Sequence, residues 1–245
     1  MTGTTRDRLP SVTTMEAPIR RLLILNPNGN PAVNALLASL ADRVLPTGIE
    51  ARVLNPPQSP LSIQTPADRA EAEPLALDLM TRNPGYDAYV MACFDDIALT
   101  AGRRVMNAPV IGPVEASVTF ARQCADRFAV VTTVEGAVPG IRRALASLGA
   151  AQQCAVRAAG IGVAAAAKGS AAADRCLDAA IRHLRDEHEA QVIILGSAGL
   201  AGRAQALAMR HGLPVIDAME AAIRLAAAIA AGDSRQLSGV VARTG

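Results

Sequence analysis

The chain carries one pattern twice, at an offset of 104 to 106 residues. An apolar run that ends at Cys93 is repeated by a run that ends at Ser197, and each leads into a helical segment. Each copy then returns through a Pro-Val-Ile strand, at 109–111 and 214–216. Short apolar runs bounded by turn residues are typical of buried strands. The repeat therefore predicts that one α/β lobe has been duplicated.

Strands and helices alternate along the chain. Strands are expected at 21–25, 48–54, 86–93, 108–112, 127–132, 151–158, 191–195 and 213–217. Helices are expected at 32–44, 66–81, 96–106, 114–127, 138–148, 171–189, 200–211 and 218–231, with a soft Ala/Gly segment at 159–170. Such alternation indicates parallel sheets flanked by helices. The predicted fold class is α/β, with two pseudo-symmetric lobes and the active site between them.

The pattern also predicts how the chain divides. Residues 1–19 are polar and rich in Thr and Arg, and are expected to form a flexible tail. The first lobe is expected to combine 20–117 with 218–245, and the second to span 118–217. Residues after Gly232 are expected to dock on the first lobe as a tail.

Composition excludes several classes of protein. A net charge of +2 and 2% aromatic residues provide no basic stripe or stacking platform for nucleic acid. The one lysine, Lys168, lies outside the strand-end loops, which argues against Schiff-base chemistry. The four cysteines lack Cys-x-x-Cys spacing, so no metal site is expected. Without a secretory signal or a membrane-spanning run, the chain is expected to be cytoplasmic.

The duplicated strand ends predict two facing catalytic groups. Lobes related by a pseudo-twofold axis would bring Cys93 and Ser197 together across a cleft. That geometry suits the removal of a proton from one face of a carbon and its return to the other. A thiol, with a reference pKa of about 8.5, titrates closer to neutrality than a hydroxyl.

Five blocks stand at or near the strand ends: Asn26-Pro-Asn28, Ala92-Cys-Phe-Asp-Asp96, Pro109-Val-Ile-Gly112, Val131-Thr-Thr133 and Leu195-Gly-Ser-Ala-Gly199. Over residues 20–232 they resemble the aspartate/glutamate/hydantoin racemase superfamily, and most of all its hydantoin and allantoin racemase branch. Such enzymes use two facing cysteines and no cofactor. The resemblance implies that Cys93 is the first catalytic thiol and that a substrate pocket is lined by Asn26, Phe94, Thr132, Thr133, Gly196 and Ala198.

The same resemblance implies an activity. It points to a racemase that inverts the carbon next to a carbonyl in a small cyclic ureide, either a 5-substituted hydantoin or allantoin. No metal is expected, the partner is a small-molecule substrate, and the chain is expected to form a homo-oligomer.

The chain departs from the family pattern at the second catalytic position, where Ser197 replaces a cysteine. A serine hydroxyl is a weak base without an activating partner. Three interpretations stay open: a slow or substrate-restricted racemase, a one-base decarboxylase or isomerase, and an engineered Cys→Ser exchange. A non-catalytic ligand-binding relative is a further alternative.

Other chemically interesting residues are expected to be structural. Asp95 and Asp96 are expected to cap the helix that follows Cys93. The remaining cysteines lack a strand-end context and are expected in the core, at Cys124, Cys154 and Cys176.

Overall fold

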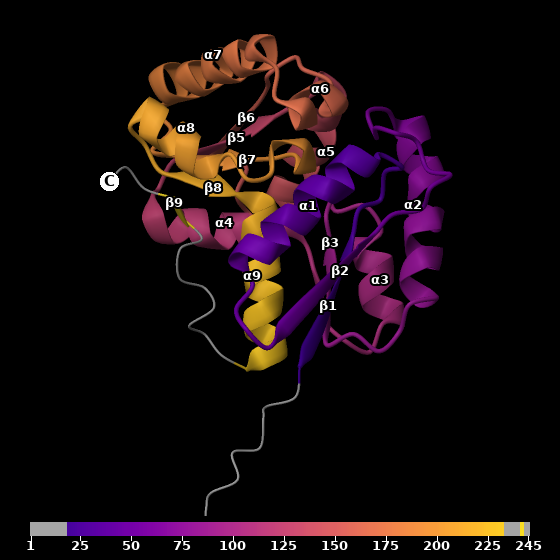
Figure 1. Ribbon diagram of the computed structural model, residues 1–245. Coiled ribbons are helices and arrows are strands. Elements are labelled where there is room, and N and C mark those ends of the chain that lie inside the picture. The colour runs from indigo at the N-terminus through magenta and orange to yellow at the C-terminus, as the bar shows by residue number, and fades with distance from the viewer. Residues whose placement is uncertain (1–18, 233–240, 243–245) are drawn as a thin grey trace, which may run out of the picture.

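The computed structural model describes residues 19–232 and 241–242, which form two α/β lobes (Figure 1). The first sheet is parallel, in the order β2-β1-β3-β4, with strands β1 (Arg20–Leu25), β2 (Ile49–Leu54), β3 (Ala88–Met91) and β4 (Val110–Ile111). The second sheet has the order β6-β5-β7-β8-β9. Its parallel strands are β5 (Phe128–Thr132), β6 (Cys154–Ala158), β7 (Val192–Leu195) and β8 (Val215–Asp217), and β9 (Val241–Ala242) is antiparallel to β8. The predicted α/β fold is confirmed.

The two sheets repeat the same pairing. Residues 22–25 of β1 pair in register with 88–91 of β3, and 128–131 of β5 pair with 192–195 of β7. Every residue of β3 and β7 is buried, as expected for central strands of a parallel sheet covered on both faces. The duplicated apolar runs of the sequence are therefore duplicated central strands.

Helices connect successive strands and flank the sheets. They are α1 (Pro31–Val44), α2 (Pro66–Thr81), α3 (Leu99–Val105), α4 (Pro113–Cys124), α5 (Val138–Ser147), α6 (Val163–Lys168), α7 (Ala171–His188), α8 (Ala204–His211) and α9 (Ala218–Ala231), with 3₁₀ turns η1 (Glu135–Ala137) and η2 (Ala198–Leu200). Local chemistry sets their starts. Asn30 caps α1 by accepting a hydrogen bond from the backbone N–H of Ala32, and Thr65 and Asp68 form a capping box on α2.

Two helices cross between the lobes and join their cores. α4 follows β4 of the first sheet but packs against β7 and β8 of the second. α9 follows β8 but packs against β1 and β3 of the first sheet, and the two helices pack on each other (Figure 1). One apolar core extends through both lobes. Because each sheet is covered by a helix from the other lobe, burial of apolar surface holds the two strand-end loops in a fixed relation.

Asp217, at the end of β8, fixes the start of α9. Its buried carboxylate accepts hydrogen bonds from the backbone N–H groups of Met219 and Glu220 at 3.0 and 3.3 Å. It also accepts one from the N–H of Gly202 at 2.5 Å. Burial raises the pKa of this carboxyl to about 6. A single side chain therefore joins the loop after η2 to the crossing helix.

Asp217→Ala is expected to destabilise the protein by about 2–3 kcal/mol, because α9 loses its cap and the N–H of Gly202 loses its partner. Urea unfolding followed by circular dichroism measures the change. Asp186, exposed on α7, provides the control Asp186→Ala, which is expected to shift stability by less than about 0.5 kcal/mol. Equal shifts in the two variants would contradict the prediction.

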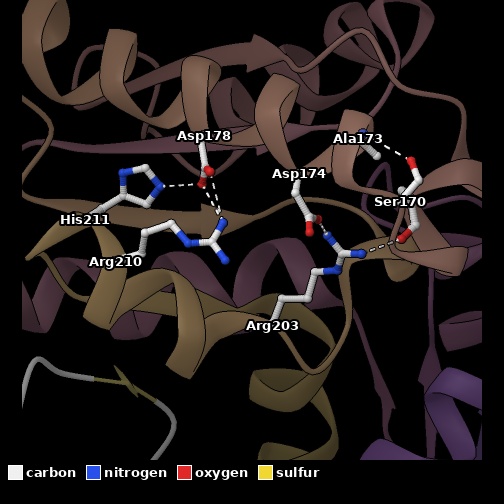
Figure 2. A network of polar contacts seen from close by, with 8 residues as sticks. Ser170, Ala173, Asp174, Asp178, Arg203, Arg210 and His211 are labelled. Atoms are coloured by element: carbon white, nitrogen blue, oxygen red, sulfur yellow. Dashed lines mark hydrogen bonds and ion pairs between the residues drawn. The ribbon is translucent and has the colours of Figure 1, made fainter.

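A polar network ties α7 to α8 on the outside of the second lobe (Figure 2). Asp174 pairs with Arg203 at 2.7 Å, and Asp178 contacts Arg210 at 2.9 Å and Nε2 of the buried His211 at 2.8 Å. Burial raises the pKa of Asp178, but hydrogen bonds from His211 and Arg210 outweigh it and lower that pKa overall. The network stabilises the outer helices and lies outside the strand-end loops.

Two helix predictions near the strand ends are wrong. The helix expected at 96–106 begins only at Leu99, because Asp96 and Ala98 both have a φ of 55°, which a right-handed helix does not allow. Asp95 and Asp96 do not cap it: the N-cap position is Ala98, with no side-chain hydrogen bond. The helix expected at 200–211 begins only at Ala204, after the 3₁₀ turn η2.

The structure also differs from the sequence-based predictions in one loop segment, in the burial of two cysteines and in the position of the C-terminal segment. The segment at 159–170, for which no helix was predicted, contains the short helix α6. Cys154 is buried as predicted, but Cys124 and Cys176 are exposed on helix surfaces. Val241 and Ala242 pair with β8 of the second sheet, whereas the tail was expected on the first lobe. The tail expected over 1–19 lies outside the described residues except for Ile19. No helix in the described ranges is long and apolar enough to cross a membrane.

Candidate active site

A cavity of about 60 Å³ lies between the lobes, at the carboxyl ends of their strands. Ligands of open α/β sheets bind at this end of the strands. The first lobe contributes Asn28, Ile63, Ala92, Cys93, Phe94 and Asp95, and the second contributes Thr132, Thr133, Val134, Ala137, Val163, Gly196, Ser197 and Ala198. The structure therefore brings together every site residue expected from the sequence except Asn26.

Asn26 lies behind the cavity and not on its wall. It is fully buried, and its Nδ2 donates to Oδ1 of Asn28 at 3.1 Å and to Oδ1 of Asn34 at 2.9 Å. Asn28 in turn lines the cavity. Asn26 therefore orients the amide that reaches the cavity and does not reach it itself.

Cys93 lies two residues after the end of β3 and keeps partial exposure toward the cavity. Burial raises the pKa of its thiol above the ordinary range, and the neighbouring carboxylate of Asp95 raises it further. The guanidinium of Arg69 and the backbone N–H of Asp95 act in the opposite direction but do not compensate. The thiol is therefore protonated at neutral pH, and its thiolate, once formed, is a strong base.

Asp95 is held by groups from both lobes. Arg69 of α2 forms an ion pair with its carboxylate and donates to its carbonyl oxygen at 3.1 Å. Gly140 of α5 lies so close that a Cβ there would be 2.9 Å from Oδ2 of Asp95. These contacts fix a carboxylate beside the Cys93 thiol.

Asp96 is half-buried in the same loop, and its buried Oδ1 has no hydrogen-bond partner among the described residues. Burial raises the pKa of this carboxyl to about 7, helped by the negative charge of Glu115. Ionised Asp96 raises the pKa of the Cys93 thiol. Asp96 thus gains its charge near neutrality and then opposes formation of the thiolate.

Ser197 follows β7 on the opposite side of the cavity. Its Oγ accepts a hydrogen bond from the backbone N–H of Gly199 at 3.3 Å and one from the Thr133 hydroxyl at 3.4 Å. Thr132 donates to the carbonyl of Gly196 at 2.8 Å, which ties the end of β5 to the end of β7. Among the described residues, neither His nor Lys lines the cavity, so none of them provides a base that could activate Ser197.

Phe94 and Gly196 determine how closely the lobes approach. A Cβ on Gly196 would lie 2.9 Å from Cδ1 of Phe94 and 2.5 Å from Cγ1 of Val130. The Phe94 ring of the first lobe therefore packs directly on the backbone of the second lobe, next to Ser197. Any larger residue at 196 would push the two strand ends apart.

Comparison with known proteins identifies the family. The model of a family described as Asp/Glu/Hydantoin racemase matches residues 22–226. The chain belongs to the Asp/Glu/hydantoin racemase family. The resemblance found in the strand-end blocks is thereby confirmed.

Individual members of the Asp/Glu/hydantoin racemase family are similar over most of their length. A hydantoin racemase of Rhizobium meliloti is 36% identical over 209 residues, which cover 84% of this chain and 87% of that protein. The solved allantoin racemase from Klebsiella pneumoniae has a TM-score of 0.81 at 32% identity, covering 89% of this chain and 93% of that one. The allantoin racemase from Pseudomonas fluorescens has a TM-score of 0.82 at 27% identity, covering 89% and 96%.

Several residues that line the cavity of this racemase-family chain lie outside the pocket set implied by the resemblance, although the sequence favoured Asn28 as a binding residue: Asn28, Ile63, Ala92, Asp95, Val134, Ala137 and Val163. Asn28 carried a signal, because it follows a strand end within Asn-Pro-Asn. Ile63 and Val163 come from segments with no strand-end motif. Within the described residues, no group of His, Cys, Asp and Glu side chains could hold a metal ion.

Proposed function

We propose that the protein is a cofactor-independent racemase that inverts the carbon next to a carbonyl in a small cyclic ureide, a 5-substituted hydantoin or allantoin. Family membership and similarity to hydantoin and allantoin racemases support this reaction class. The observation that carries the proposal is that Cys93 and Ser197, from different lobes, line one small cavity. Two groups on opposite walls are what inversion of a carbon requires.

In this proposal Cys93 is the catalytic acid/base on one face of the ring. The C5 hydrogen of a hydantoin is acidic because the adjacent carbonyl stabilises the resulting enolate, but it is still a weak acid. A thiolate whose pKa is raised accepts such a proton more readily than an ordinary one. Asn28 lines the same cavity, and its side-chain amide can donate hydrogen bonds to the enolate oxygen.

Ser197 takes the second catalytic position. Because its oxygen accepts two hydrogen bonds, its own hydrogen is available to point into the cavity. The hydroxyl can therefore donate toward C5 from the second face, but it is a poor base. We expect fast proton exchange on the Cys93 face and slow inversion.

A second candidate is a one-base enzyme that acts on one face only. The single thiol on the cavity wall favours it, since decarboxylation of a malonate-type acid needs one protonation. Release of carbon dioxide from such an acid would distinguish this activity from racemisation.

Incubating L-5-methylhydantoin and L-allantoin with the protein in D₂O tests the proposal. Proton NMR measures loss of the C5 hydrogen, and polarimetry measures loss of optical rotation. We expect exchange above the rate without protein, with rotation lost more slowly than hydrogen. Exchange with full retention of rotation would favour the one-base enzyme. No exchange with either compound or with a wider hydantoin panel would rule out the proposal.

The cytoplasmic location and the homo-oligomeric state of the protein stay predictions.

A further inference from the structure

The cavity between the lobes is small for the substrates proposed. Its volume of about 60 Å³ corresponds to about four to six water-sized sites, since each needs about 10–15 Å³. A planar five-membered ring with its two carbonyl oxygens fills such a space. A substituent on C5 therefore has to lie outside it.

A second hollow, of about 390 Å³, lies beside the cavity, and we call it the outer chamber. It is bounded by residues 63–66 and 69 of the first lobe and by residues 136, 137, 139, 140 and 143 of the second, with Asp95 between them. Ile63, Asp95 and Ala137 line both the cavity and the outer chamber. These three residues therefore form the boundary between the cavity and the outer chamber.

The lobes meet at this boundary. The backbones of Gln64 and Gly136 are in such close contact that a Cβ on Gly136 would overlap the carbonyl oxygen of Gln64. The boundary between the two hollows therefore has one side from each lobe. A C5 substituent that extends from the cavity into the outer chamber would pass between Ile63 and Ala137, which line both hollows.

The outer chamber is lined by two arginines, Arg69 and Arg143, and by one carboxylate, Asp95. Arg69 is neutralised by its ion pair with Asp95. Arg143, exposed on α5, enters none of the ion pairs formed between described residues. The chamber therefore presents one guanidinium without a paired anion. A guanidinium binds a carboxylate through two parallel hydrogen bonds.

Building on the proposed function, we infer that the outer chamber holds the C5 substituent and that Arg143 selects substituents ending in a carboxylate. The preferred substrate class is then a 5-(carboxyalkyl)hydantoin. Ile63 and Ala137 contact the alkyl part of the substituent, and Arg143 binds its terminal anion. Arg143 is a specificity-determining residue and takes no part in proton transfer.

Two substrates of the same shape test this inference: 5-(2-carboxyethyl)hydantoin and its neutral amide, 5-(2-carbamoylethyl)hydantoin. Wild type is expected to favour the acid by about 3- to 10-fold in kcat/KM for C5 exchange. Arg143→Met is expected to remove that preference and leave the amide unchanged. Arg142→Met is the matched control: its side chain is exposed on the same helix but lines a different hollow, and the preference is expected to persist.

Binding of both compounds is measured in parallel by isothermal titration calorimetry. Selective binding of the acid that depends on Arg143, without exchange, would support the substituent site and refute the racemase. Equal use and equal binding of the two compounds by wild type would overturn the inference and leave the racemase standing. The same effect in Arg142→Met as in Arg143→Met would overturn it as well.

Discussion

Replacing Cys93 with alanine is expected to slow C5 exchange by about 10²- to 10⁴-fold, the usual contribution of a positioned acid/base. Among the described residues that line the cavity, Cys93 is the one thiol, and the other ionisable side chain, Asp95, is held by Arg69. Since burial and Asp95 raise the pKa of the thiol, wild-type exchange is expected to rise with pH through the alkaline range. The alanine variant is expected to lose that rise. Proton NMR in D₂O between pH 7 and pH 10 measures both effects.

Cys154→Ala is the matched control for loss of a buried thiol. Burial raises the pKa of Cys154 to about 12, but this residue begins β6 and does not line the cavity. The exchange rate of the Cys154→Ala variant is expected to match that of wild type within about twofold at each pH. Circular dichroism of both variants establishes that they fold. A folded Cys93→Ala variant that retained full exchange would remove the thiol from the mechanism.

The repeat was sufficient to predict the architecture and the position of the cavity. Similar apolar runs at offsets of 104 to 106 residues are expected to occupy equivalent strands, and the register of β1 with β3 and of β5 with β7 shows that they do. Polar residues just after such strands, Cys93 and Ser197, necessarily lie at the same edge of their sheets. The local pattern of apolar residues was therefore enough to predict the repeated strands and the position of the cavity between them.

What the sequence did not predict depends on contacts between distant segments. Ile63 reaches the cavity because the loop before α2 packs on η1 of the other lobe. That contact cannot be predicted from the residues around Ile63 in the sequence. Asp95 resembles a helix cap in sequence, but the positive φ of Asp96 and Ala98 delays the helix. Asp95 then pairs with Arg69, far away in the chain. Its pairing with Arg69 depends on tertiary structure, whereas its effect on the pKa of Cys93 follows from the short distance between them in the sequence.

Ser197→Cys is expected to accelerate loss of optical rotation by about 10²- to 10³-fold, while C5 exchange changes far less. The hydroxyl at this position is a weak base, and no His or Lys on the cavity wall activates it. A thiol titrates within reach of neutrality and can accept or return the proton on the second face. The ratio of rotation loss to exchange, measured by polarimetry and NMR on one sample, isolates this effect from any change in binding.

Ser197→Ala separates the role of the hydroxyl from the effect of a new thiol. If the Ser197 hydroxyl donates a proton toward C5, the alanine variant exchanges hydrogen on the Cys93 face but loses rotation more slowly than wild type. Both Ser197 variants keep the neighbouring bond from Thr132 to the carbonyl of Gly196, so the end of β7 stays in place. Racemisation that was equally slow with cysteine, serine and alanine at 197 would mean that the second face of the cavity takes no part in proton transfer. The one-base alternative would then describe the protein, because Cys93 would act alone.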